Sequence, residues 1–364
     1  MISLSAAAAG HEVLFIESPF DVRALATRAG RRTWLDGLGT RTIEVQPRIR
    51  VRSQATLVPG HRSDLAQRLD TWRLRRGLRA PPGPGDPVLV ATQPWQWPAV
   101  KAVPARSRVF DCADDWRALI PRRAHAFDAM YRQIALEADA VILASTYLAS
   151  AFSGAPVTVV RNGASEELLR APVTERPAEL RMVYAGTLSE RFDAPFISAV
   201  VGHLTDWTLE LFGECRYAGR GSSPDGELQR LLSAHPGRVT WHGPVGRERL
   251  SEALDRGRVL IAAHRAAQVV GQDSMKLYDY VARDRPIVST PGALGERSTV
   301  EAVSVVEAAT PVAFAEAVAR AERPAPGVSA DRRGWVLEHR WEDRWPEWAR
   351  AALGREESGG VGRR

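Results

Sequence analysis

Lysine is almost absent from this sequence. Of its 49 basic residues only Lys101 and Lys276 are lysines, and the remainder are arginines. Cysteine is scarce too: Cys112 and Cys215 lie far apart and form no Cys-x-x-Cys motif, which argues against a disulfide framework or a structural zinc site. No apolar run approaches the roughly 18 residues that a membrane-spanning helix needs, and the N-terminus lacks the basic segment of a secretory signal. These absences favour a cytoplasmic protein without a structural metal.

The residues that are present place the chain among globular proteins of two domains. Its 364 residues exceed one ordinary domain, and 45% are apolar against 25% charged. Residues 1–165 hold 22 basic against 14 acidic side chains, a net charge of +8, whereas the rest of the chain carries −2. This basic half could face nucleic acid, an anionic membrane or an acidic acceptor. No nucleic-acid-binding motif supports the first of these, and solvated arginines are the simpler interpretation.

Short apolar runs alternate with helix-length segments along most of the chain. We expect strands at 13–16, 88–92, 108–111, 140–144, 157–160, 182–185, 208–212, 239–241, 259–262 and 286–289. Helices are expected between them, for example over 122–138, 194–204 and 247–255. Apolar strands separated by helices predict parallel sheets covered on both faces. The pattern therefore predicts an α/β protein of two Rossmann-like domains, joined near residues 168–179, with ligands at the carboxyl ends of the strands.

Lys276, one of the two lysines, lies in an unusual segment, DSMKLYDYVA at 273–282. Asp279 follows Lys276 by three residues, so both fall on one face of a helix. An ammonium is a compact charge that can lie under a phosphate, and a carboxylate can accept hydrogen bonds from ribose hydroxyls. The pair predicts a nucleotide site. A solvated ion pair is the alternative, which the mostly apolar and aromatic neighbours disfavour.

Gly186 directly follows the strand expected at 182–185 and precedes the polar Thr187. At the carboxyl edge of a sheet, a glycine lets the backbone approach a phosphate, whose charge the next helix N-terminus favours. Arg191 could reach the same phosphates through its guanidinium. An ordinary turn with a surface arginine remains the alternative.

Several motifs, taken in order, resemble the GT-B glycosyltransferases of family 4, also called group 1. VVRNGA at 159–164 is similar to the V-I-P-N-G-V motif that closes the family's N-terminal domain. VYAGTLSERFD at 183–193 resembles the first strand and loop of the nucleotide-binding domain, and VTWHGPV at 239–245 resembles a later strand. MKLYDYVA from 275, followed by PIV from 286, is similar to K-L-x-E-Y-L-A-x-G-x-P-V-V. The segment DCADDW at 111–116 resembles teichuronic-acid-type members.

The resemblance implies a GT-B architecture of two facing Rossmann-like domains with parallel sheets. It implies an acceptor-side domain over 1–168, a nucleotide-sugar-binding domain over 169–330, and a helix over 331–353 that packs back on the first domain. A polar tail over 354–364 is expected to be disordered. Trp341, Trp345 and Trp348 share one face of that last helix and suit the packing.

The implied activity is transfer of a sugar from a nucleotide-diphosphate-sugar to an acceptor hydroxyl, with retained configuration and without a metal or other cofactor. The acceptor could be a glycan, a lipid-linked precursor or a secondary metabolite, and the enzyme would be cytoplasmic or peripheral at the inner face of the membrane. A nucleotide-sugar 2-epimerase and a non-catalytic nucleotide-binding partner subunit are the alternatives.

The donor site that the resemblance implies comprises residues from three loops and one helix. They are Gly186, Thr187, Arg191, His264, Gln272, Asp273, Ser274, Met275, Lys276 and Asp279. Family members often carry a glutamate eight residues before the acid at position 279, and it touches the transferred sugar; here Gly271 stands in its place. Gln272 and Asp273 are therefore expected to contact sugar hydroxyls instead.

The acceptor side is expected to involve Asp114 and Asp115, which follow the strand at 108–111. One of these carboxylates could orient or deprotonate an acceptor hydroxyl, although capping of a helix N-terminus is an equally natural use. Trp95, Trp116 and His125 are the candidates for binding the acceptor. Core packing for Trp95 and a plain surface position for His125 are the favoured alternatives.

The resemblance also implies a missing element at the front of the sequence. Residues 3–9 resemble the end of the family's first helix, and 10–15 resemble its second strand, so the first strand and its loop are absent. A parallel sheet without that strand would expose apolar edges and unpaired backbone groups. We therefore expect an incomplete, less stable N-terminal domain.

Overall fold

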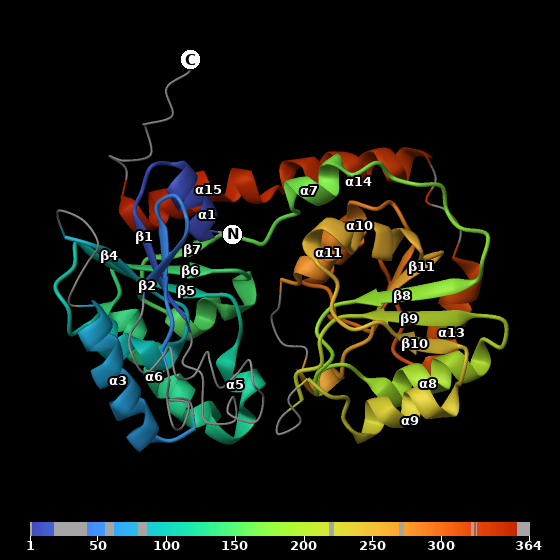
Figure 1. The fold of residues 1–364 in the computed structure, drawn as a ribbon, viewed down its shortest axis with the longest axis horizontal. Coiled ribbons are helices and arrows are strands. Elements are labelled where there is room, and N and C mark those ends of the chain that lie inside the picture. The colour runs from blue at the N-terminus through green and yellow to red at the C-terminus, as the bar shows by residue number, and fades with distance from the viewer. Residues whose placement is uncertain are drawn as a thin grey trace, which may run out of the picture. The chain divides into compact units, whose positions relative to one another are not determined.

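The structure, a computed structural model, divides into two compact units (Figure 1). It describes residues 2–17, 42–54, 62–78, 86–217, 222–268, 273–321, 324 and 326–354. The first unit takes in 1–143, 148–160 and 345–364, and the second takes in 144–147 and 161–344. The division after Val160 lies upstream of the boundary that the sequence suggested at 168. Most of the tail expected to be disordered, 355–364, lies outside the described residues.

The second unit is built on a six-stranded sheet in the order β10-β9-β8-β11-β12-β13, with every neighbouring pair parallel. Its strands are β8 (Arg181–Ala185), β9 (Thr208–Phe212), β10 (Val239–Trp241), β11 (Val259–Ala262), β12 (Ile287–Ser289) and β13 (Val306–Glu307). Met182 and Tyr184 of β8 enter one hydrophobic core, and Val183 and Ala185 enter another. Both faces are thus covered, as continuous apolar strands require.

Helices lie on the two faces of this sheet (Figure 1). The cores place α8 (Ala194–His203), α9 (Gly226–Ala234) and α13 (Pro311–Arg320) on one face. The other face carries α7 (Glu166–Arg170), α10 (Arg247–Asp255), α11 (Met275–Val281), α12 (Arg297–Ala302) and α14 (Pro326–Glu338). The 3₁₀ helix η5 (Ala266–Gln268) follows β11. The alternation predicted from sequence is confirmed for this unit.

The first unit contains a parallel sheet of β4 (Val88–Ala91), β5 (Ser107–Cys112), β6 (Ala140–Leu143) and β7 (Val157–Val159). Its helices are α3 (Asp64–Leu78), α4 (Trp97–Val100), α5 (Trp116–Leu119), α6 (Ala124–Glu137) and α15 (Trp341–Leu353), with 3₁₀ turns η2 (Pro94–Gln96), η3 (Pro121–Arg123) and η4 (Thr146–Phe152). Trp348 of α15 joins the core formed by Val109 and Ile142, and its Nε1 donates to Asp111 Oδ2 at 2.9 Å. The end of the last helix therefore packs within this unit.

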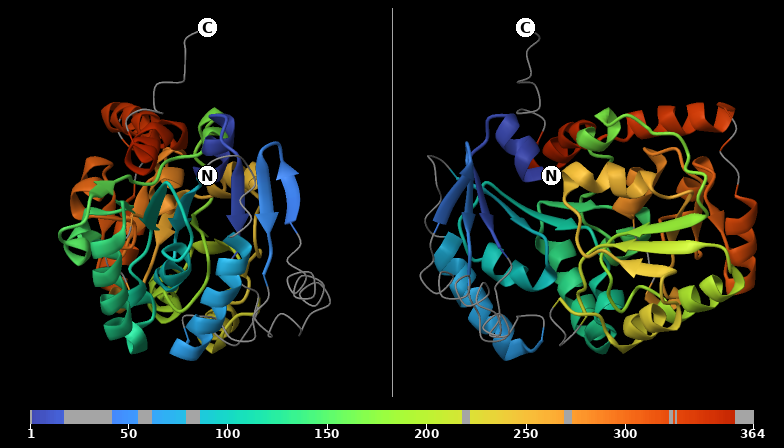
Figure 2. Two further views of the ribbon diagram at one scale, coloured as in Figure 1. Left: turned by 90° about the vertical axis from the view of Figure 1, so that its left-hand side faces the viewer. Right: turned by 45° about the vertical axis from the view of Figure 1, so that its right-hand side comes forward.

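The front of the chain forms a separate sheet (Figure 2). Helix α1 (Ile2–Ala8) precedes β1 (Val13–Ile16), β2 (Thr42–Gln46) and β3 (Ile49–Arg52), which pair in the order β1-β3-β2. Among the described residues no ladder joins this sheet to β4–β7. β1 and β4 are edge strands, and Phe15 and Val90 on them are 47% and 39% exposed. Each of these two edges thus carries an exposed apolar side chain, and the missing first strand stays a prediction.

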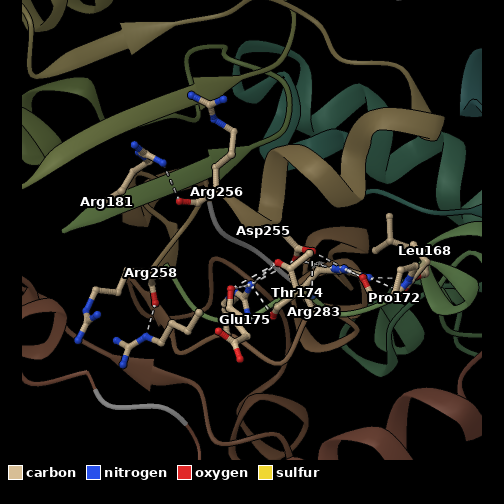
Figure 3. Close-up of polar contacts among 12 residues, drawn as sticks. Leu168, Pro172, Thr174, Glu175, Arg181, Asp255, Arg256, Arg258 and Arg283 are labelled. Carbon is tan, nitrogen blue, oxygen red and sulfur yellow. Dashed lines mark hydrogen bonds and ion pairs between the residues drawn. The ribbon is translucent and has the colours of Figure 1, made fainter. Parts of the chain in front are cut away.

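Buried arginines tie the segment that follows α7 to the end of α11 (Figure 3). Arg283 donates to both carboxylate oxygens of Asp255 and to the carbonyls of Leu168, Ala171 and Pro172. Arg285 donates to carbonyl oxygens of the same segment, at Thr174 and Glu175. Arg283 lies two residues after the last residue of α11, so this network holds the helix that carries Lys276 and Asp279.

Two further observations concern the described part of the chain. None of its helices is both long and apolar enough to cross a membrane. No cluster of three His, Cys, Asp or Glu side chains within it is placed to hold a metal ion.

Candidate functional site

In the six-stranded sheet of the second unit, a glycine lies just beyond the end of each of three neighbouring strands. Gly186 follows β8, Gly213 follows β9 and Gly243 lies just beyond β10, with φ angles of +152°, +147° and +77° that L side chains rarely adopt. The Gly186 N–H donates to Phe212 O at 2.8 Å, and the Gly213 N–H donates to Gly243 O at 2.7 Å. A Cβ on Gly213 would lie 1.9 Å from Gly186 O. The strand ends are therefore stacked backbone against backbone.

Lys276 lies directly against this glycine turn. A Cβ added to Gly186 would be 2.1 Å from Lys276 Cε and 2.8 Å from Nζ. The Nζ atom is 5.4 Å from the centroid of the Tyr184 ring, a cation–π contact. Burial, and next the positive charge of Arg191, lower the pKa of Lys276 to about 8, although Asp279 opposes this. The turn after β8 thus holds an ammonium where an approaching anion would meet it.

Asp279 faces the same cavity one turn further along α11. Burial raises its pKa to about 7, although Arg247 and Lys276 favour the ionised form. The cavity has a volume of about 350 Å³, and two larger ones of about 600 and 440 Å³ in this unit contain neither member of the pair. The lining residues are Ala185, Gly186, Thr187, Phe212, Gly213, Glu214, Pro244, Val245, Leu250, Leu254, Met275, Lys276, Asp279 and Tyr280. One wall is therefore apolar, and the floor carries the charged pair.

His264 follows β11 and is buried beside the same cations. Its backbone is fixed by Thr290, whose Oγ1 accepts from the His264 N–H and donates to the His264 carbonyl. Burial, together with the charges of Lys276 and Arg191, holds the pKa of His264 well below its ordinary value. The imidazole is therefore neutral, and its buried Nδ1 has no hydrogen-bond partner among the described residues. Such an atom is suited to bind a ligand hydroxyl.

Asp273 has a different task from the sugar contact expected of it. Its carboxylate accepts hydrogen bonds from the Asn162 N–H at 2.6 Å and from the Tyr278 hydroxyl at 2.9 and 3.0 Å. The side chain has no exposed surface. We therefore correct the expectation: Asp273 ties the segment at Asn162 to α11. Gln272, the other residue expected at the sugar, and Gly271 lie outside the described residues.

The remaining predicted donor residues surround the cavity unequally. Thr187 and Met275 line it, and Ser274 is the N-cap residue of α11. The helix N-terminus expected to attract phosphate, that of α8, is already capped, since Asp193 accepts a hydrogen bond from the Phe196 N–H at 3.1 Å. A carboxylate there offsets the positive end of the helix. The structure therefore does not support a contribution of that helix to anion binding.

In the first unit, Asp115 is a structural residue. It is the N-cap of α5 and accepts from the Arg117 N–H at 3.0 Å. The same carboxylate pairs with the Arg117 guanidinium at 2.8 Å, and only 4% of the residue is exposed. The capping alternative thus replaces the expected catalytic role for Asp115. Asp114 is half-exposed, and its role stays a prediction.

The aromatic residues predicted to bind an acceptor are mostly packed. Trp95 is 5% exposed, and its ring lies edge-on to Trp116 at 4.7 Å between centroids. Trp95 therefore belongs to the core, which was the favoured alternative to acceptor binding. His125 is exposed on α6, and its predicted role, like that of the half-buried Trp116, stays a prediction.

Sequence reasoning missed Gly213, Tyr184 and Glu296. Gly213 had a usable signal, because it follows an apolar strand in the same way as Gly186. Glu296 had none, since its partners Ser145, Thr146 and Arg161 are more than a hundred residues away. Burial would raise the pKa of Glu296, but hydrogen bonds from these three residues lower it to about 2. Glu296 fixes two backbone segments that belong to the second unit.

A parallel sheet with glycines just beyond its strands, and with a buried cation and a carboxylate beside them, is an arrangement suited to a phosphate-bearing ligand. The family model for group 1 glycosyl transferases matches residues 180–322, which contain the whole cavity. This part of the chain is therefore similar to the group 1 glycosyl transferases. No curated protein sequence is significantly similar to the chain.

Solved structures share the fold of the whole chain. Sucrose-phosphate synthase from Thermosynechococcus elongatus matches with a TM-score of 0.70 and 17% identity, over 96% of this chain and 90% of that one. HepE from Anabaena, in complex with UDP and glucose, has a TM-score of 0.62 and 12% identity, over 95% and 100%. WaaG, a glycosyltransferase involved in lipopolysaccharide biosynthesis, has a TM-score of 0.61 and 11% identity, over 97% and 94%. The chain therefore has the GT-B fold, which confirms the fold that the resemblance implied. The similarity of 111–116 to teichuronic-acid-type members stays a prediction.

Proposed function

We propose that the protein is a glycosyltransferase that moves a sugar from a nucleoside-diphosphate donor to an acceptor hydroxyl. The observation that carries this proposal is the placement of Lys276 against Gly186, with Asp279 one turn away, in the cavity of the second unit. The ammonium is suited to the diphosphate, and the Asp279 carboxylate is suited to ribose hydroxyls.

In the proposed reaction, the bond between the donor sugar's anomeric carbon and the diphosphate oxygen breaks. The acceptor oxygen bonds to that carbon and passes its proton to the departing diphosphate oxygen, and configuration is retained. Negative charge develops on the departing diphosphate, where the cations Lys276 and Arg191 stabilise it. The neutral His264 can accept a hydrogen bond from a sugar hydroxyl through Nδ1. These residues supply the charge stabilisation without a metal, and Asp114, Trp116 and His125 stay candidates for contact with the acceptor.

A thermal-shift panel of UDP, GDP and dTDP tests the donor site. We expect one nucleotide to stabilise the wild type, by about 2.7 kcal/mol when it is present at a hundred times its Kd. Lys276→Ala and Asp279→Ala should lose this response, because each removes a group that binds the nucleotide. The matched control is Lys101→Ala, which removes the other lysine, paired with Glu137 in the first unit, and should respond like the wild type.

The proposal fails if no nucleotide stabilises the wild type, or if both site variants respond like it. If a nucleotide does stabilise the wild type, incubation with the matching nucleotide-sugar alone distinguishes a transferase from a 2-epimerase. Slow hydrolysis supports a transferase, whereas production of an epimeric sugar supports the 2-epimerase alternative.

Nucleotide affinity is expected to fall as the pH rises above about 8. In the free protein the pKa of Lys276 is about 8, and a bound diphosphate raises it, so binding above that pH requires uptake of a proton. The affinity then falls by up to tenfold per pH unit. Arg191, Asp279 and His264 also face this lysine, and Arg247 acts on Asp279. His264 stays neutral over the range because its pKa is depressed.

Calorimetric titration with the stabilising nucleotide at about pH 7 and pH 9 measures this effect. Lys276→Arg should bind more weakly and show a smaller fall in affinity between the two values, because its guanidinium stays charged and only Asp279, whose pKa is about 7, titrates over this range. An unchanged wild-type affinity between the two pH values would show that Lys276 does not bind the diphosphate.

A further inference from the structure

Helix α3, which lies in the first unit (Figure 1), carries apolar side chains on its outer face as well as its inner one. The inner face buries Ala66 and Leu74. On the outer face Leu65, Leu69 and Trp72 are 70%, 50% and 57% exposed. Their spacings of four and three residues place them in one stripe along the helix. A helix that only covered a core would carry polar residues on that face, so the stripe indicates a further binding surface.

Arginines surround this apolar stripe. Arg68, Arg75 and Arg76 lie on or beside it by their helical spacing, and the Arg76 guanidinium lies 5.0 Å from the centroid of the Trp72 ring. Neither carboxylate of α3 offsets these charges. Asp70 is buried, and Asp64 pairs with Arg123 at 2.7 Å.

The same stretch of chain is basic as a whole, since residues 1–165 carry a net charge of +8. The outer face of α3 therefore combines exposed leucines, a tryptophan and arginines. This is the composition of helices that lie in the plane of a membrane surface, with the apolar stripe at the acyl boundary and the cations at the headgroup phosphates.

We propose that α3 is an in-plane anchor that binds the protein to bilayers containing anionic lipid, through the stripe Leu65–Leu69–Trp72. A membrane fits this surface better than a second copy of the chain does. In a symmetric dimer the same patch meets itself, so Arg68, Arg75 and Arg76 of both copies would be brought together. This anchor does not depend on the proposed transfer reaction, because none of its residues lines the nucleotide cavity.

Co-sedimentation with sucrose-loaded vesicles tests the anchor on the full chain. We expect binding to phosphatidylcholine vesicles with about 30% phosphatidylglycerol, weak binding to pure phosphatidylcholine, and release when salt rises from about 0.05 M to 0.5 M. Each arginine near an anionic surface contributes about fivefold to the partition coefficient. Replacing Arg68, Arg75 and Arg76 together by glutamine should therefore weaken binding about 100-fold.

The double variant Leu69→Ser, Trp72→Ser should weaken binding at least tenfold at low salt, because the inserted apolar area is lost. Leu136→Ser is the matched control: Leu136 is 88% exposed on α6 of the same unit, outside the stripe, and its loss should change nothing. All variants should keep the wild-type Tm and nucleotide response, which separates a failure of this proposal from a failure of the donor site.

Two results would overturn the anchor. One is wild-type protein that does not sediment with anionic vesicles, or a Leu69→Ser, Trp72→Ser variant that sediments equally well. The other is light scattering that shows a dimer for the wild type and a monomer for this variant, which would make the stripe an interface between two copies.

Discussion

Alanine at position 186 is expected to weaken nucleotide binding about 100-fold while the protein remains folded. The added Cβ would lie 2.1 Å from Lys276 Cε, at the far end of a flexible side chain, so the ammonium must move away from the turn. Loss of a charge-assisted contact to a diphosphate weakens binding by about 100-fold, or ~2.7 kcal/mol. Calorimetric titration of Gly186→Ala with the nucleotide that stabilises the wild type measures the loss.

Gly202→Ala is the matched control for this substitution. Gly202 lies in α8 of the same unit, and no atom lies within 4 Å of a Cβ built there. Alanine in a helix should stabilise the fold by about 0.5–1 kcal/mol and leave binding unchanged. Wild-type affinity in Gly186→Ala would mean that the position of Lys276 does not matter to the nucleotide.

Replacement of Arg283 by methionine is expected to destabilise the second unit severely. It removes the hydrogen bonds to the buried carboxylate of Asp255 and to three backbone carbonyls. Arg285 is 3.7 Å from the same carboxylate and compensates only in part. An uncompensated buried charge costs about 3–5 kcal/mol, which should lower the Tm by roughly 10 °C.

Arg297→Met provides the comparison for this prediction. Arg297 also pairs with a carboxylate, that of Glu301, but its side chain is 86% exposed. Loss of an exposed pair should change the stability by less than about 0.5 kcal/mol. Similar Tm values for the two variants would show that the Arg283 network is not what holds the end of α11.

The sequence predicted β1 and all but one strand of the two larger sheets because these strands are short, mainly apolar runs. All ten expected strands are observed, from β1 to β12. The missed strands have other patterns: β2 and β3 read TIEVQ and IRVR, with polar and charged residues interleaved, and β13 has two residues. Such short, mixed segments become strands through pairing with a neighbour, which a search for apolar runs does not detect.

The same distinction applies to the site. Gly186 and His264 come together because each follows a strand at the carboxyl edge of one sheet, and Lys276 joins them from the first turn of α11, the helix between β11 and β12. Chain order is enough to predict this. Asp273 and Asp115 were misjudged because their roles depend on hydrogen-bond partners. The partner of Asp273 is Asn162, 111 residues away.

The sequence by itself determined the order of strands and helices and the placement of Lys276 and Asp279 one turn apart, because these follow from local periodicity. Only the tertiary structure decided which acids are ligands and which are structural, since the pKa and availability of a carboxylate depend on burial and on distant partners. The tertiary structure also explains why position 186 is a glycine. Lys276, 90 residues further along the chain, occupies the space that a side chain there would need.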